Sequence, residues 1–184
     1  MARIDQNPGI RPTLTIGRRL DIAARHAFPA FTTVMMMLLT ELPLKMPGQA
    51  ALLPAVALIA VWFWSLVRPS SMPPLAVFVI GFLLDLRAYL PLGSGVLTLL
   101  IAHGMAARFG RGLVQQGFAM VWLVFGFVAT GAAALLWLLT ALLTFRLLSP
   151  APALFQAAIT AALYPVLAIP FASAHRTLAN PEQA

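Results

Sequence analysis

The sequence predicts an all-α integral membrane protein, folded as a compact bundle of six transmembrane helices with short loops. Hydrophobic residues make up 61% of the 184-residue chain and charged residues only 9%, too few charges for a surface that faces water. The apolar residues gather in six stretches, separated by five short breaks that are polar or rich in proline and glycine. Such short connections make consecutive helices antiparallel and leave no room for an extramembrane domain.

The six stretches cover residues 27–44, 50–67, 73–89, 94–108, 117–145 and 153–173. A helix needs roughly 17–25 residues to cross about 30 Å of hydrocarbon, because it rises 1.5 Å per residue. The stretch 94–108 is the shortest of the six, whereas 117–145 is long enough that its helix must tilt, bend or project from the membrane. Residues 27–173 therefore form the predicted transmembrane domain, flanked by cytoplasmic tails at 1–26 and 174–184.

The amino-terminal tail is basic and weakly amphipathic. A helical projection from Ile16 places small and apolar residues on one arc and most charged residues opposite. This pattern predicts a short helix that lies on the membrane surface against anionic lipid. Its expected membrane-surface basic residues are Arg11, Arg18, Arg19 and Arg25. The tail is too long and too polar to be a secretory signal peptide.

The twelve basic residues predict the orientation of the bundle. With a cytoplasmic amino terminus, six spans place nine of them on the inner side and three on the outer side. The inner residues are Arg3, Arg11, Arg18, Arg19, Arg25, Arg68, Arg108, Arg111 and Arg176, and the outer ones are Lys45, Arg87 and Arg146. Positive residues collect on the cytoplasmic side of membrane proteins, so both termini are predicted there. The basic surplus thus indicates topology, and we expect no nucleic-acid partner.

Two acidic residues fall outside the tails, and a charge within hydrocarbon costs several kcal/mol. Glu41 lies four residues before Lys45, the favourable order for an ion pair near the interface. Asp85 lies deeper, in the outer half of the third span. It either faces the bundle interior, a cavity or a partner, or it is a locally hydrogen-bonded acid that fixes the end of the span. Arg87 is only two residues away and projects from a different helix face.

We expect no catalytic residues, no metal site and no cofactor. The sequence contains no nucleophile elbow, Walker loop or HExxH motif, and it has no cysteine. His103 in the fourth span is either a hydrogen-bonded interior group or a proton carrier. No second histidine or acid stands at ligand spacing to it.

One segment resembles a known family. Residues 81–93, GFLLDLRAYLPLG, resemble the signature of the rod shape-determining protein MreD family: a glycine, three apolar residues, an aspartate, and a proline-leucine-glycine a few residues later. The motif residues are Gly81, Asp85, Pro91 and Gly93. The Trp-rich second span, which ends at Arg68 and Pro69, also looks like that family's second span. Arg87 stands where many relatives carry an apolar or small residue.

The resemblance implies a non-enzymatic subunit of the bacterial cell-elongation machinery in the inner membrane. Its expected partners are membrane lipids, an MreC-like bitopic protein, an MreB-like filament, and the elongation glycosyltransferase and transpeptidase. The family's helix arrangement is thought to be similar to the substrate-binding components of energy-coupling-factor transporters. The alternative is therefore a solute-binding component, in which Asp85, Arg87, Tyr89 and His103 line a polar cavity. An unrelated proton-coupled carrier is a third interpretation.

Overall fold

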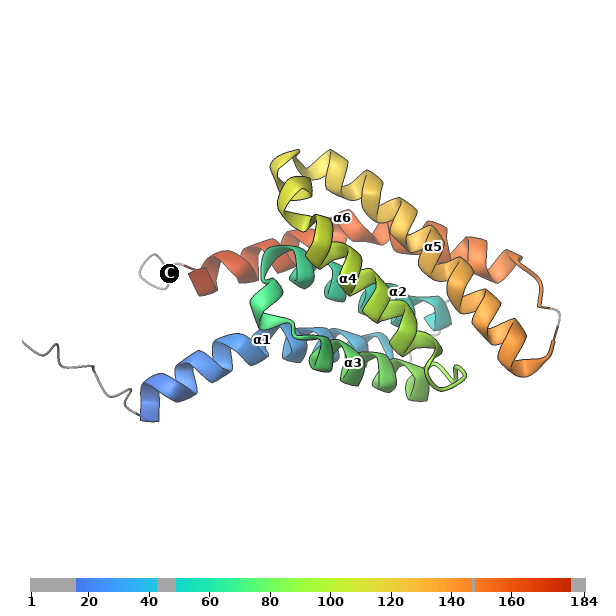
Figure 1. Ribbon diagram of the computed structural model, residues 1–184, viewed down its shortest axis with the longest axis horizontal. Coiled ribbons are helices and arrows are strands. Elements are labelled where there is room, and N and C mark those ends of the chain that lie inside the picture. Colours follow the sequence, from blue (N-terminus) through green and yellow to red (C-terminus); the bar gives the residue numbers. More distant parts are fainter. Residues whose placement is uncertain (1–15, 43–48, 147, 180–184) are drawn as a thin grey trace, which may run out of the picture.

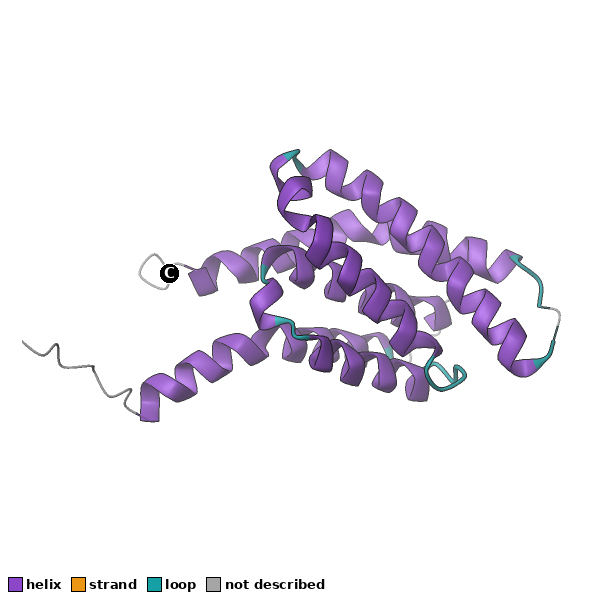
Figure 2. Cartoon of the chain, in the orientation of Figure 1, coloured by secondary structure: helices purple, strands orange, loops and turns teal. Residues whose placement is uncertain are grey.

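The fold is entirely helical in the residues that the computed structural model describes, which are 16–42, 49–146 and 148–179. Side chains are described for 27–42, 49–146 and 148–173. Figure 2 shows helices joined by loops, and no strand lies in these ranges. The six α-helices are α1 (Ile16–Thr40), α2 (Gln49–Val67), α3 (Pro74–Arg87), α4 (Ser94–Gln115), α5 (Phe118–Thr144) and α6 (Ala151–Ala179), and a 3-10 turn, η1 (Pro69–Ser71), precedes α3.

The helices run roughly along the long axis of the molecule in three layers (Figure 1). α1 and α3 lie on one side, α5 and α6 on the other, and α2 and α4 lie between them. The most extensive helix pairs are α3 with α4 and α5 with α6, followed by α2 with α4 and α2 with α6. Both of the leading pairs are antiparallel neighbours joined by a short connection, as short loops require.

The central helix is α2, whose residues from Ala55 to Ser65 are all buried. A helix that is apolar around its whole circumference is stable only when neighbours cover every face. Here α1, α3, α4 and α6 all contact it. Trp62 and Trp64 are almost completely buried, and their rings pack against Phe125 of α5 and Phe171 of α6 respectively. The aromatic core thus joins the middle layer to α5 and α6.

Three of the described helical segments are long and apolar enough to cross a membrane: Gln49–Val67, Phe118–Thr144 and Ala151–Ser173. The apolar segment Ala27–Thr40 is shorter, and α3 has only 14 residues. α5 and α6 leave much of their apolar surface uncovered; Phe127 and Ile169, for example, are 73% and 69% exposed. Such exposure suits a lipid environment better than water.

The prediction of an all-α fold is confirmed, and each of the six apolar stretches contains a helix. The predicted break at 109–116 is wrong, because α4 continues to Gln115. Arg111 falls within that predicted break, but arginine is a good helix former and does not end a helix. α1 begins at Ile16 and α6 ends at Ala179, so both helices extend from the apolar stretches into the predicted tails.

Candidate functional site

The carboxylate of Asp85 lies at the amino end of α4, where it accepts hydrogen bonds from backbone amides. The amide of Gly93 donates to Oδ2 over 2.8 Å, and the amide of Gly95 donates to Oδ1 over 2.6 Å. The Ser94 hydroxyl and the Val96 amide approach the same carboxylate at 3.5 Å. Asp85 is only 1% exposed. Its environment is therefore that of a hydrogen-bonded acid that joins α3 to α4.

This contact solves a problem that every helix start presents. The first amides of a helix have no partner within the helix, and an aspartate or serine next to the start usually accepts their hydrogen bonds. In α4 the residue before the helix is Gly93, which has no side chain to do so. Asp85, from the preceding helix, takes that position, and the positive end of the α4 dipole favours its negative charge.

Glycines make this approach of the two helices feasible. A Cβ atom on Gly81 would lie 2.6 Å from the Cα of Val96, so only glycine lets α3 approach the α4 backbone there. A Cβ on Gly95 would overlap Oδ1 of Asp85. Gly93 has a φ of 95°, in the left-handed region that glycine adopts without strain. These three glycines and Asp85 therefore form one close-packed helix hairpin.

Pro91 belongs to the same turn. Its carbonyl oxygen accepts hydrogen bonds from the Ser94 amide, at 3.1 Å, and from the Ser94 hydroxyl, at 2.7 Å. The structure thus brings Gly81, Asp85, Pro91 and Gly93 together at the α3–α4 connection. Arg68 and Pro69, the residues at the end of the second span that also resemble the family, lie at the opposite end of α3, where the chain leaves α2 through η1. The amide of Arg68 donates to the carbonyl of Trp64 over 2.8 Å, which continues the hydrogen bonding of α2 by one residue.

Arg87 forms an ion pair with Glu41, the residue that follows the last residue of α1, with 2.9 Å between Nη1 and Oε2. The side chains are 45% and 29% exposed, so the pair lies at the surface. Lys45, the partner expected for Glu41, lies outside the described residues. Arg87 thus joins α1 to α3, and its guanidinium is directed to Glu41, while Asp85 is directed to α4.

The four residues of the expected polar cavity do not converge. Tyr89 is 96% exposed, whereas Asp85 and His103 are buried in separate places. His103 Nδ1 lies 2.8 Å from the Ser65 hydroxyl of α2, and that hydroxyl donates to the carbonyl of Val61. His103 therefore donates from Nδ1 to Ser65, and this bond joins α2 to α4. Four cavities along the described helices have mostly apolar walls, and none is lined by these four residues.

Other expected site residues lie beyond the described positions. Arg11 is outside the described residues, and for Arg18, Arg19 and Arg25 only the helical backbone of α1 is described. Among the described residues, no group of three or more histidine, cysteine or acidic side chains is placed to hold a metal ion.

Sequence reasoning missed several polar contacts between helices. Besides the His103–Ser65 bond, Nε2 of Gln156 in α6 donates to the carbonyl of Ala51 in α2 over 3.0 Å. Gln156 is the single glutamine in the apolar stretches. A lone amide in an apolar helix signals a hydrogen bond across helices, although its partner here is a backbone carbonyl, which no sequence pattern marks.

Comparison of the chain with protein-family models, with curated proteins and with solved structures finds no match.

Proposed function

We propose that the chain is a non-enzymatic scaffold subunit of the bacterial cell-elongation complex. In this function it holds an MreC-like bitopic protein, an MreB-like filament, and the peptidoglycan glycosyltransferase and transpeptidase together at the inner membrane. The observation that carries the proposal is the geometry of residues 81–93, the segment that resembles the MreD signature. Each of the four motif residues has a specific position in one helix hairpin.

The hairpin supports a scaffolding function because it fixes an exposed turn. Tyr89 and Leu92 are 96% and 65% exposed, and they flank Pro91 between the two helices. Because Asp85 ties α3 to the start of α4, the backbone that carries these two side chains is held between the two helices. A preorganised surface loses less conformational entropy on binding than a mobile loop does. The turn is therefore suited to contact a partner protein at the membrane surface.

The membrane arrangement belongs to the same proposal. All six α-helices cross the inner membrane, both termini are cytoplasmic, and the α3–α4 turn lies on the outer side. Three long apolar helices and the exposed apolar faces of α5 and α6 support this arrangement. So does the distribution of the twelve basic residues, nine inside and three outside.

The test is complementation of cell shape. In rod-shaped cells that have lost their shape because their own MreD protein is depleted, expression of this chain should restore rods. The chain should also co-purify from membranes with MreC-like and MreB-like proteins. If cells of the source bacterium keep their rod shape after depletion of this chain, the proposal is overturned.

Two variants connect the test to the motif. Asp85→Ala leaves buried amides at the start of α4 without an acceptor, a cost of about 1–3 kcal/mol. It should impair complementation or lower the amount of protein in the membrane. Glu41→Ala removes only a surface ion pair, which contributes about 0–1 kcal/mol, and serves as the matched control. Wild-type behaviour of both variants would contradict the motif interpretation.

A further inference from the structure

We infer that an apolar groove between α2, α5 and α6 binds one acyl chain of an anionic phospholipid. The groove has a volume of about 340 Å³. It lies at the end of the bundle where α2 and α4 finish and α5 begins, the end predicted to face the cytoplasm. This volume is near the lower end of the roughly 300–1,000 Å³ range of small-molecule sites, and it suits a single chain.

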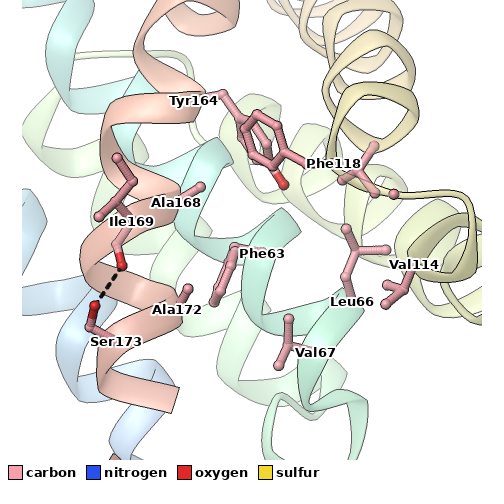
Figure 3. A pocket seen from close by; sticks show the side chains of 12 residues that line it. Phe63, Leu66, Val67, Val114, Phe118, Tyr164, Ala168, Ile169, Ala172 and Ser173 are labelled. Carbon is pink, nitrogen blue, oxygen red and sulfur yellow. Dashed lines mark hydrogen bonds between the residues drawn. The ribbon is translucent and has the colours of Figure 1, made fainter. Parts of the chain in front are cut away.

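The walls of the groove are apolar, apart from two hydroxyl-bearing residues at different levels. Figure 3 shows Tyr164 stacked beside Phe118 near one end, and Val67 and Ser173 near the other. Most of the remaining lining side chains are aliphatic, such as that of Ile169, which is 69% exposed. From Tyr164 to Ser173 the groove follows α6 for about 13 Å, at 1.5 Å per residue. An open apolar channel of this kind fits a hydrocarbon chain better than a polar solute.

The Tyr164 hydroxyl is the polar group that distinguishes this groove from a simple gap between helices. Tyr164 is 2% exposed, and its ring packs against Phe118 and Phe125. The hydroxyl points toward the space between the lining side chains (Figure 3), and no described residue forms a hydrogen bond with it. A tyrosine hydroxyl that opens into an apolar groove normally has a hydrogen-bond partner. An ester oxygen of a lipid in the groove supplies one.

The charges around the groove favour an anionic headgroup. Arg111 lies three residues before Val114, which lines the groove, so the two side chains share a face of α4. Arg108 lies one turn further back, and both arginines are exposed. The two carboxylates among the described side chains, those of Glu41 and Asp85, lie at the opposite end of the bundle. This end is therefore positive.

The start of α5 adds to this positive potential. The residue before the helix, Gly117, lines the groove and provides no side-chain hydrogen bond to the first amides of α5. Amides at a helix start attract phosphate, and the helix dipole reinforces this attraction. A phosphate placed between the start of α5 and Arg111 leaves the acyl chain of the same lipid beside Tyr164. The groove and its rim thus match the two parts of one molecule.

Native mass spectrometry of the full-length protein in detergent tests the inference. The protein is mixed with phosphatidylglycerol or with phosphatidylcholine that carries the same acyl chains, so that only the headgroup charge differs. The wild-type protein should retain phosphatidylglycerol at least about fivefold more strongly, the contribution expected of one basic residue. Equal retention of the two lipids, or retention of a second polypeptide in place of lipid, would overturn the inference.

Conservative variants assign the binding to this groove. Arg111→Gln should reduce retention of phosphatidylglycerol about fivefold and leave phosphatidylcholine unchanged. Tyr164→Phe removes only the hydroxyl and should reduce retention of both lipids by a similar factor. The controls are Arg146→Gln and Tyr89→Phe, because both residues are exposed and far from the groove. The groove is excluded as the binding site if the first two variants retain lipid as the controls do.

Discussion

The carboxylate of Asp85 accepts hydrogen bonds from the amides at the start of α4. In most helices a serine or aspartate directly before the first helical residue does this. The difference is that Asp85 comes from the preceding helix, eight residues before Gly93. One charged group therefore stabilises two features, the first turn of α4 and the contact between α3 and α4. Because the bonds go to backbone amides, a neutral side chain with a single acceptor cannot replace both carboxylate oxygens.

A prediction at the residue level concerns Gly95. Gly95→Ala places a methyl group against Oδ1 of Asp85, so the carboxylate must leave the amides of α4. We expect a cost of about 1–3 kcal/mol, which lowers the melting temperature of the detergent-purified protein by about 2–4 °C per kcal/mol. Gly104→Ala is the control, because Gly104 lies on the same helix and a Cβ atom there would meet nothing within 4 Å. A variant at Gly95 as stable as the one at Gly104 would rule out this function of Asp85.

At the level of helices, the apolar stretches predicted the number and order of the α-helices, because each stretch contains one helix. The end of α4 was not predictable from polarity. Gly110 faces Leu66 of α2, so this part of α4 is packed against the bundle even though Arg108 and Arg111 face outward. Packing, which depends on residues of another helix, outweighed the local charge pattern.

The candidate site was predictable in part for a similar reason. The composition singled out Asp85 as the acid that needed explanation, but not what it contacts. The carboxylate oxygens of Asp85 accept hydrogen bonds from backbone amides. Every residue except proline carries such an amide, so the sequence does not mark the donors. The Glu41–Arg87 pair joins residues that are far apart in sequence, and nothing in the local pattern favours it over a pair with Lys45.

The close contacts of α4 with its two neighbours lead to a second prediction. At Gly81, a Cβ atom would meet the backbone of Val96, which moves only if α4 shifts as a whole. At Gly110, a Cβ atom would lie 2.9 Å from the Cδ2 atom of Leu66, the end of a flexible side chain. We expect Gly81→Ala to cost about 1–3 kcal/mol and Gly110→Ala clearly less. Melting temperatures of the two variants measure the difference. If Gly110→Ala lowers the melting temperature more than Gly81→Ala does, the α3–α4 contact at Gly81 is not tighter than the α2–α4 contact at Gly110.

For the whole molecule, the two ends of the bundle differ in chemistry. Both carboxylates of the described side chains lie at the α3–α4 end, and Arg68, Arg108 and Arg111 lie at the other end, near the apolar groove. This difference agrees with the predicted orientation, in which the basic end faces the cytoplasm. Whether the whole molecule is a six-span bundle depends on the helices outside the three long apolar ones, and among them α3 extends only about 21 Å.

The turn between α3 and α4 decides this question experimentally. The chain has no cysteine, so single cysteines can be introduced without a background. If α3 and α4 cross the membrane, Leu92→Cys reacts in intact spheroplasts with a maleimide that cannot pass the membrane, because Leu92 is 65% exposed at the outer end. Ser149→Cys, in the loop between α5 and α6, should react alike, whereas Ser70→Cys and Gln116→Cys should react only after the membrane is opened. All four positions are exposed in the structure, so burial does not account for a difference. If Leu92→Cys, like Ser70→Cys, reacts only after the membrane is opened, the α3–α4 turn lies on the cytoplasmic side. The six-span arrangement is then wrong.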